Sequence, residues 1–209
     1  MMRKIIYTVT ILLISISCNK TVKNEASDSI KSKYENSKKE ETGKTLPSAD
    51  YSSLLVNYEC DMTAAEIAKV FDIPETDVSV PEYQRAGRCA FVIKGFGQNT
   101  LGDETVIQWF LENVGKAQVK KEIQNYLKDQ ANNKSVLGMG IEMSETGDSY
   151  VAKIPMSGRA VIMNENYDSW LLLSYSQKGM YKSRTEAQHA ALGEKTMALA
   201  NYLLKKHKK

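Results

Sequence analysis

The sequence is poor in the residues that carry most catalytic and metal chemistry. Its 209 residues include two histidines, His189 and His207, and three cysteines. None of these shows a paired spacing such as C-x-x-C or H-x-x-x-H, so nothing indicates a metal site. A nucleophilic triad needs a nearby base, and only the two histidines could supply one. We expect His189 to be a hydrogen-bonded structural residue, with a catalytic base as the alternative, and His207 to lie in a solvated tail.

Phosphate-binding motifs and a strong net charge are also missing. Gly95-Phe96-Gly97 and Gly138-Met139-Gly140 lack the rest of a G-x-G-x-x-G pattern and the Lys-Ser/Thr of a P-loop. We interpret them as turns, although a ligand could approach the backbone closely at the second. The formal net charge is only +3, from 28 basic and 25 acidic residues. That balance gives no long-range attraction to nucleic acid, and we expect neither a nucleic-acid partner nor a cofactor.

The first 18 residues form the clearest motif. Arg3 and Lys4 precede an apolar run over residues 5–16, which ends in Ser15-Ile16-Ser17-Cys18. The segment resembles a bacterial lipoprotein signal, although Ser15 stands where leucine is commonest. The resemblance implies cleavage before Cys18 and lipidation of that residue. The alternatives are an ordinary secretory peptide and an uncleaved anchor, but the apolar run is shorter than the roughly 20 residues of a membrane span.

We therefore predict a signal peptide over residues 1–17, a lipidated Cys18 with a disordered tether over 18–50, and a single α+β domain over 51–209. The tether has too few apolar side chains for burial to offset its ordering entropy. Removing the leader lowers the basic residues from 28 to 26 against 25 acidic ones, and 42% apolar residues suffice for one core. The expected location is the bacterial cell envelope, lipid-anchored to the membrane, either on the periplasmic side of the outer membrane or at the cell surface.

The two remaining cysteines, Cys60 and Cys89, would lie in a compartment where thiols oxidise. We predict a disulfide between them. Closing a loop of about 30 residues would stabilise the fold by roughly 3 to 4 kcal/mol on the chain-entropy model. The bridge would join the start of the first helix to the following strand.

Capping motifs and apolar spacing predict three helices. Thr63 and Glu66 form one capping box, and Ser183 and Glu186 form another. The helices are expected to run from Thr63 to Pro74, from Asp103 to Asp129 with a bend at Gly115, and from Ser183 to Lys206. Extended segments are expected at 88–94, 135–142, 149–155, 159–164 and 169–176.

This order favours an α+β domain in which a short N-terminal helix, a long middle helix and a C-terminal helix pack on a mostly antiparallel sheet of about four to five strands. Cys60-Asp61-Met62-Thr63-Ala64-Ala65-Glu66-Ile67 is followed by a second cysteine in a strand, a Val136-Leu137-Gly138-Met139-Gly140 turn and an Ala/Leu-rich last helix. Over residues 54–204 the chain is thereby similar to a group of small bacterial lipoproteins of unknown function. The resemblance implies a PsbP-like α/β/α sandwich with a binding or assembly role.

Aromatic side chains are the best candidates for partner contacts. Trp109 and Phe110 are adjacent, so one of them should be partly exposed on a helix, where successive residues differ by about 100°. Exposed tryptophan and tyrosine are typical anchors at interfaces, and core packing is the alternative. The predicted partner-binding residues are Trp109, Trp170, Tyr167 and Tyr175.

The sequence thus predicts a membrane-tethered, non-catalytic binding or interaction module for a protein, glycan or small ligand, with an inhibitor or immunity protein as one version. The first alternative is a carboxylate-dependent envelope hydrolase. It requires a raised pKa and the convergence in one cleft of at least two of Glu142, Glu145, Asp148 and Asp168. The second alternative is a structural assembly subunit with a large apolar surface.

Overall fold

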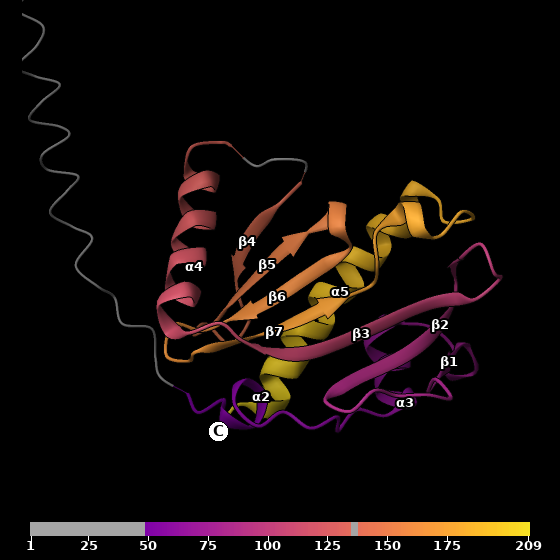
Figure 1. Ribbon diagram of the computed structural model, residues 1–209, viewed down its shortest axis with the longest axis horizontal. Coiled ribbons are helices and arrows are strands. Elements are labelled where there is room, and N and C mark those ends of the chain that lie inside the picture. The colour runs from indigo at the N-terminus through magenta and orange to yellow at the C-terminus, as the bar shows by residue number, and fades with distance from the viewer. Residues whose placement is uncertain (1–48, 135–137) are drawn as a thin grey trace, which may run out of the picture. The chain divides into compact units, whose positions relative to one another are not determined.

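The computed structural model describes residues 49–134 and 138–209, so the predicted signal peptide, Cys18 and nearly all of the predicted tether lie outside the described residues, as do Val136 and Leu137. Within these ranges seven antiparallel strands form one sheet in the order β1-β2-β3-β7-β6-β5-β4 (Figure 1). The strands are β1 Val78–Ser79, β2 Arg88–Gln98, β3 Glu104–Asn113, β4 Gly140–Met143, β5 Tyr150–Ile154, β6 Arg159–Met163 and β7 Ser169–Ser174. The α-helices are α2 Ser52–Leu55, α3 Ala64–Phe71, α4 Lys116–Ala131 and α5 Glu186–His207. None of these helices has the length and hydropathy needed to span a membrane.

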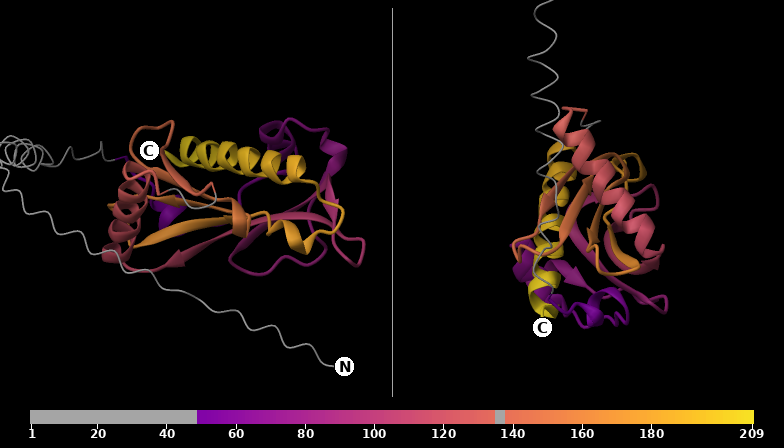
Figure 2. Two further views of the ribbon diagram at one scale, coloured as in Figure 1. Left: turned by 90° about the horizontal axis from the view of Figure 1, so that it is seen from above. Right: turned by 90° about the vertical axis from the view of Figure 1, so that its left-hand side faces the viewer.

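Helices lie on both faces of the sheet, and they cover the two faces unequally. Helix α5 runs along one face of the sheet, as Figure 2 shows, and packs there with α2 and α3 over the larger core. This face is the inner face, and the opposite one is the outer face. Helix α4 lies on the outer face, where Val119 and Ile123 cover a smaller core that includes Val161 and Leu172. The outward side chains of β3 stay half-buried, so part of the outer face is accessible.

The prediction of four to five strands is wrong, mainly because the first half of the predicted middle helix is strand β3. Its buried residues alternate, with Thr105, Ile107 and Trp109 facing the inner core. The four-residue spacing of Val106, Phe110 and Val114 also fits a helix, and apolar side chains on both faces conceal the two-residue period. Gly115 is not a bend within the helix, because it is the residue before α4, with φ 85°.

Strand β2 is also longer than predicted. It continues through Gly95-Phe96-Gly97 to Gln98, and its register with β3 shifts between Ile93 and Gln98. The two glycines have φ 85° and 93°, a region that favours glycine, so the predicted turn is an irregularity within the strand.

The predicted capping box of the first helix is confirmed, whereas that of the last helix is wrong. Thr63 and Glu66 exchange both capping hydrogen bonds at the start of α3. Helix α5 is capped instead by Thr185 and Gln188. Ser183 lies before the helix, where its hydroxyl accepts from the backbone N–H of Gln98 at 2.6 Å. A capping pair two residues further along the chain can satisfy the N-terminal helix donors equally well. The sequence pattern alone therefore does not distinguish the two capping positions.

The Cys60–Cys89 disulfide is present, with the two Cα atoms 5.0 Å apart. It joins the segment before α3 to strand β2 and so holds a helix of the inner layer against the sheet. The bridge closes over a sequence separation of 29 residues, close to the loop length expected from the sequence.

His207 was predicted to lie in a solvated tail, but only 9% of it is exposed. Its Nδ1 lies 3.1 Å from the Ser53 hydroxyl, and its Nε2 lies 3.5 Å from a carboxylate oxygen of Asp61. Burial lowers the pKa of His207, although Asp61 opposes that shift. The correction has a simple cause: α5 continues through His207, and the N-terminal segment of the domain packs against its last turn.

The start and the end of the described domain are paired with each other. Asp50 and Lys209 exchange two backbone hydrogen bonds, of 3.2 and 3.1 Å. Beside them the buried Tyr51 donates its hydroxyl to Asp148 at 2.7 Å, and Lys208 lies 2.9 Å from the same carboxylate. The chain therefore enters the domain beside its C-terminus.

The side chain of Arg184 is buried between β2, β3 and the segment after β7, with 2% of the residue exposed. Its guanidinium donates to the carbonyl oxygens of Phe96 (3.0 Å), Tyr175 (3.1 Å) and Ser176 (2.9 Å) and to the hydroxyl of Thr105 (2.8 Å). Burial lowers the pKa of Arg184, while the nearby tyrosines oppose that shift. Glycine is required at position 97, because a Cβ there would lie 2.7 Å from the Cα of Arg184.

We expect the substitution Arg184→Ala to lower the free energy of unfolding by about 3 kcal/mol or more, because it leaves buried carbonyl groups without a donor. Urea denaturation followed by circular dichroism measures the change. The matched control is Lys182→Ala, an exposed residue two positions away, which should change stability by less than about 0.5 kcal/mol. Equal effects of the two substitutions would contradict the structural role of Arg184.

Glu66 connects α3 to α5. Its carboxylate accepts from the hydroxyl of Tyr202 at 2.9 Å and from the ammonium of Lys206 at 3.0 Å, in addition to its capping bonds with Thr63. Burial alone would raise the pKa of Glu66, but these hydrogen bonds outweigh it and lower the pKa to about 2.

We therefore expect Glu66→Gln to destabilise the fold by about 1 to 3 kcal/mol at neutral pH. The folded-state pKa lies below the ordinary 4.5, so the charged carboxylate contributes fully above about pH 5 and the contribution is lost as the pH falls from 4.5 towards 2. Unfolding curves of the two proteins should converge near pH 2. A difference that is independent of pH would contradict this, and Glu142→Gln, at an exposed position of β4, is the control.

Candidate functional site

The outer face of the sheet carries two rows of side chains, which the strand register places side by side. In one row Val161 of β6, Leu172 of β7 and Phe110 of β3 are neighbours. In the next row Arg159, Ser174 and Gln108 are neighbours on the same three strands. An apolar row therefore lies beside a polar one, because side chains two positions apart on a strand share a face.

A cavity of about 180 Å³ lies between these rows and helix α4. Its apolar surface includes Val161, Met163 and Leu172, and its aromatic groups are Trp170 and Tyr126. The charged groups at the cavity are Glu112, Glu122 and Arg159. The cavity thus combines an apolar surface with a few polar groups, which is typical of small-ligand sites.

Hydrogen bonds fix the orientation of the polar side chains at this cavity. The indole N–H of Trp170 donates to the Glu112 carboxylate at 2.7 Å, across the β3–β7 register pair that these residues form. The Gln118 amide donates to Glu122 at 2.8 Å along α4. Burial raises the pKa of Tyr126, and the Glu122 charge adds to that shift. Trp170 is half-buried, so its ring is held in place while part of it stays accessible.

Two arginines on this face have no carboxylate partner within the described residues. Arg159 is exposed at the edge of the cavity. Arg88 lies over the ring of Phe110, 4.4 Å from its centroid, and donates to Gln108 at 3.3 Å. Arg88 of β2 is the register partner of Phe110 at the end of the apolar row, and its side chain reaches across to Gln108 of the polar row. Arg159 on β6 and Arg88 on β2 therefore place a positive charge at each end of the polar row.

The four predicted partner-binding residues do not lie together. Trp109 is fully buried and donates its indole N–H to Tyr58 at 2.7 Å, and Tyr175 is 1% exposed. Tyr167 is half-buried, and its hydroxyl accepts from the backbone N–H of Tyr51 at 2.5 Å. Only Trp170 lines the cavity, so the function proposed below uses Trp170 alone of the four.

The four carboxylates named for a hydrolase each have separate surroundings in the described structure. Asp148 is buried, and hydrogen bonds from Thr146, Lys208 and Tyr51 outweigh the effect of burial and lower its pKa. Glu145 pairs with Lys205, Asp168 accepts from Asn113 at 3.3 Å, and Glu142 is exposed on β4.

The two carboxylates that do share a cavity are Glu112 and Glu122. Sequence reasoning missed both residues. Gln108, Phe110 and Glu112 are spaced at two-residue intervals. This spacing places them on one face of the sheet, but only if residues 104–113 form a strand, which the sequence pattern did not predict.

Neither a metal-ligand cluster in the described residues nor a similarity to a known protein assigns a role to this cavity. Among residues 49–134 and 138–209, no three His, Cys, Asp or Glu side chains come together as metal ligands. The resemblance to small envelope lipoproteins and to PsbP-like domains therefore stays a prediction. No family model, no curated protein and no solved structure matches this chain.

Proposed function

We propose that the protein is a membrane-tethered, non-catalytic lipoprotein of the bacterial cell envelope, and that it binds a glycan in the cavity between α4 and the sheet. The observation that carries the proposal is the placement of Trp170. Its ring is fixed by the bond to Glu112, and Tyr126, Arg159 and Glu122 line the same cavity.

A sugar ring matches this arrangement because it has an apolar face of C–H groups and a rim of hydroxyl groups. The faces of tryptophan and tyrosine pack against the C–H groups. Carboxylate and guanidinium groups are planar and form paired hydrogen bonds with neighbouring hydroxyls, the carboxylates as acceptors and Arg159 as donor. A volume of about 180 Å³ lies below the roughly 300 to 1,000 Å³ of drug-sized sites, so it suits a single ring. The adjoining polar row, with Arg159 at one end and Arg88 bonded to Gln108 at the other, would contact further sugar units of the glycan.

The same cavity supports a second candidate function. Glu112 and Glu122 are two carboxylates at one site, as a glycoside hydrolase requires. The binding function is preferred because Glu112 already accepts the indole N–H of Trp170, which assigns it a positioning role. Glycan cleavage is therefore measured in the same experiment as glycan binding.

Lipidation at Cys18 supplies the proposed membrane attachment. Residues 19–50 would reach about 30 Å as a flexible coil, which is enough to hold the domain away from the bilayer surface. Two or three acyl chains hold a protein firmly, whereas one chain binds only marginally.

We expect Cys18→Ala to move the protein from the membrane fraction to the soluble fraction of the cell, because no lipid can then be attached. Fractionation with immunoblotting measures the distribution, and mass spectrometry of the native protein should find acyl chains on Cys18. The control is Ser17→Ala, which retains both a small residue before the cleavage point and the lipidated cysteine. Unchanged membrane fractionation of Cys18→Ala would contradict the anchor.

For the binding site, the full-length protein in detergent is tested against an array of bacterial envelope oligosaccharides, and the strongest hit is then titrated by calorimetry. Trp170→Ala removes the stacking surface and Arg159→Ala removes the hydroxyl donor, so each should weaken binding about tenfold or more. The controls are Tyr83→Ala and Lys94→Ala, an exposed aromatic and an exposed basic residue outside the cavity.

Three outcomes of this experiment are informative. Equal losses in the control variants would contradict this location of the site, and the absence of any bound oligosaccharide would contradict the glycan. Shortened oligosaccharides after incubation would favour the hydrolase, provided that Glu112→Gln or Glu122→Gln abolishes the cleavage.

A further inference from the structure

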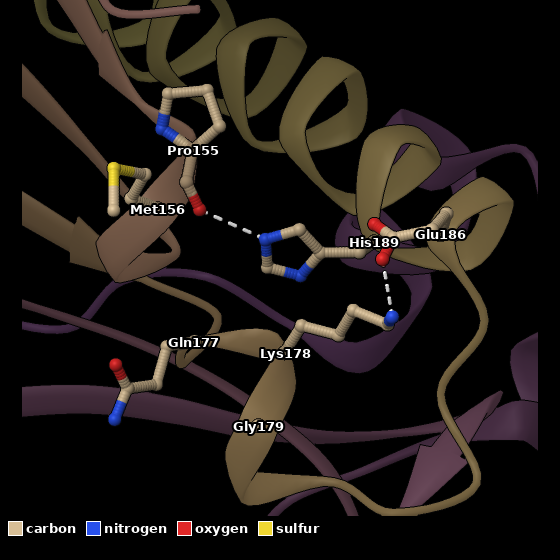
Figure 3. A pocket seen from close by; sticks show the side chains of 7 residues that line it. All are labelled: Pro155, Met156, Gln177, Lys178, Gly179, Glu186 and His189. Carbon is tan, nitrogen blue, oxygen red and sulfur yellow. Dashed lines mark hydrogen bonds and ion pairs between the residues drawn. The ribbon is translucent and has the colours of Figure 1, made fainter. Parts of the chain in front are cut away.

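A second cavity, of about 540 Å³, lies beside the first turns of α5 (Figure 3). Its wall comes from three segments: the turn Pro155–Ser157 after β5, the loop with Gln177 and Lys178, and the helix residues Glu186 and His189. It shares no lining residue with the cavity beneath α4. A ligand bound here would therefore be recognised by a different set of side chains.

His189 provides an unused hydrogen-bond acceptor in this cavity. The Nε2 of His189 lies 2.8 Å from the carbonyl oxygen of Pro155. A carbonyl oxygen only accepts, so Nε2 carries the hydrogen, and the Nδ1 of the neutral ring has a free lone pair. That Nδ1 is itself buried and has no partner among the described residues, and only 9% of His189 is exposed. A ligand would therefore have to displace the side chain that covers Nδ1. In Figure 3 Nδ1 faces the side chain of Lys178.

The hydroxyl of Tyr175 is a second buried polar atom without a partner in the described structure. The ring of Tyr175 lies 5.2 Å from that of His189, and the residue is 1% exposed. Tyr175 is not among the residues that line the cavity, so of the two unpartnered atoms only Nδ1 of His189 belongs to a lining residue.

The charged groups of the cavity have both signs. Lys178 and Glu186 form an ion pair with each other, and their side chains are 39% and 82% exposed. An ion pair this exposed contributes little to stability, so a ligand that offers both charges can replace it at little cost. Glu186 and His189 are three residues apart and thus on the same side of α5, so a carboxylate and a free nitrogen lone pair lie near one ammonium group.

We propose that this cavity binds a zwitterionic ligand of the amino-acid class. The carboxylate of the ligand pairs with Lys178, and its ammonium group donates to Nδ1 of His189 and to Glu186. Pro155 and Met156 form the apolar part of the wall, which the side chain of the ligand contacts. This site is independent of the glycan cavity and of its proposed function.

The test uses the full-length protein in detergent with free L-methionine, L-alanine, L-lysine and L-glutamate as probes. Binding is followed by calorimetry and by the nitrogen NMR signals of His189. At about 10 mM probe, a site with a Kd of about 1 mM is nine-tenths occupied. We expect at least one amino acid to bind and to shift the Nδ1 resonance, because Nδ1 gains a donor.

Two comparisons establish the recognition of both charges. Acetate lacks the ammonium group and methylamine lacks the carboxylate, so each should bind at least about tenfold more weakly than the amino acid. Lys178→Met and Glu186→Gln should each weaken the amino acid about tenfold or more. Both residues are on the surface side of the cavity, so these variants should stay folded. Lys182→Met, in the same loop region but outside the cavity, is the matched control.

The proposal is overturned if no amino acid shifts the His189 signals, if acetate binds as well as the amino acids, or if Lys178→Met and Glu186→Gln bind as well as Lys182→Met. The first result would assign the unpaired groups to water, and the second would assign the cavity to simple anions.

Discussion

The burial of the Arg184 charge is the constraint on which most of this fold depends. A buried guanidinium without a carboxylate is expensive unless nearly all its donors are used. Here four hydrogen bonds to β2, β3 and the chain after β7 supply that compensation, and the centroid of the Tyr181 ring lies 4.0 Å from the guanidinium carbon. Because the acceptors are mostly backbone carbonyls, the interaction fixes the path of the chain rather than only a pair of side chains.

The hydrogen bonds of Arg184 also fix one wall of the second cavity. Arg184 lies two residues before Glu186, the first residue of α5, and it holds the carbonyls of Tyr175 and Ser176 at the end of β7. The loop between these two points carries Gln177 and Lys178, which line the second cavity. On the outer face, β7 carries Trp170 and Leu172 into the first cavity. Arg184 therefore anchors the loop that lines the second cavity, whereas the pairing of β7 with β3 and β6 places Trp170 and Leu172 at the first.

A feature of the fold could be predicted from the sequence where its local residue pattern fits only one structure. The capping box at Thr63 and the Cys60–Cys89 bridge were predictable, because a cap motif leaves few alternatives, and so do two cysteines in a chain that carries a predicted export signal. Residues 104–113 fit two periods at once, and only pairing with β2 and β7 selects the strand. That error concealed Glu112, and it gave Trp109 a helical surface position instead of a place in the core.

The two cavities lie on either side of the connection between β5 and β6. Because this connection is closely packed, we infer that both cavities are formed before a ligand binds. Ile154, the last residue of β5, lines the first cavity, and Pro155 lines the second. The turn that follows ends at Gly158, with φ 62°, where a Cβ would lie 2.1 Å from the carbonyl oxygen of Ser176. Gly158 also accepts a backbone hydrogen bond from Tyr175 at 2.8 Å. This close packing holds the β5–β6 connection against the end of β7, so the ordering of these walls is part of folding and does not oppose binding.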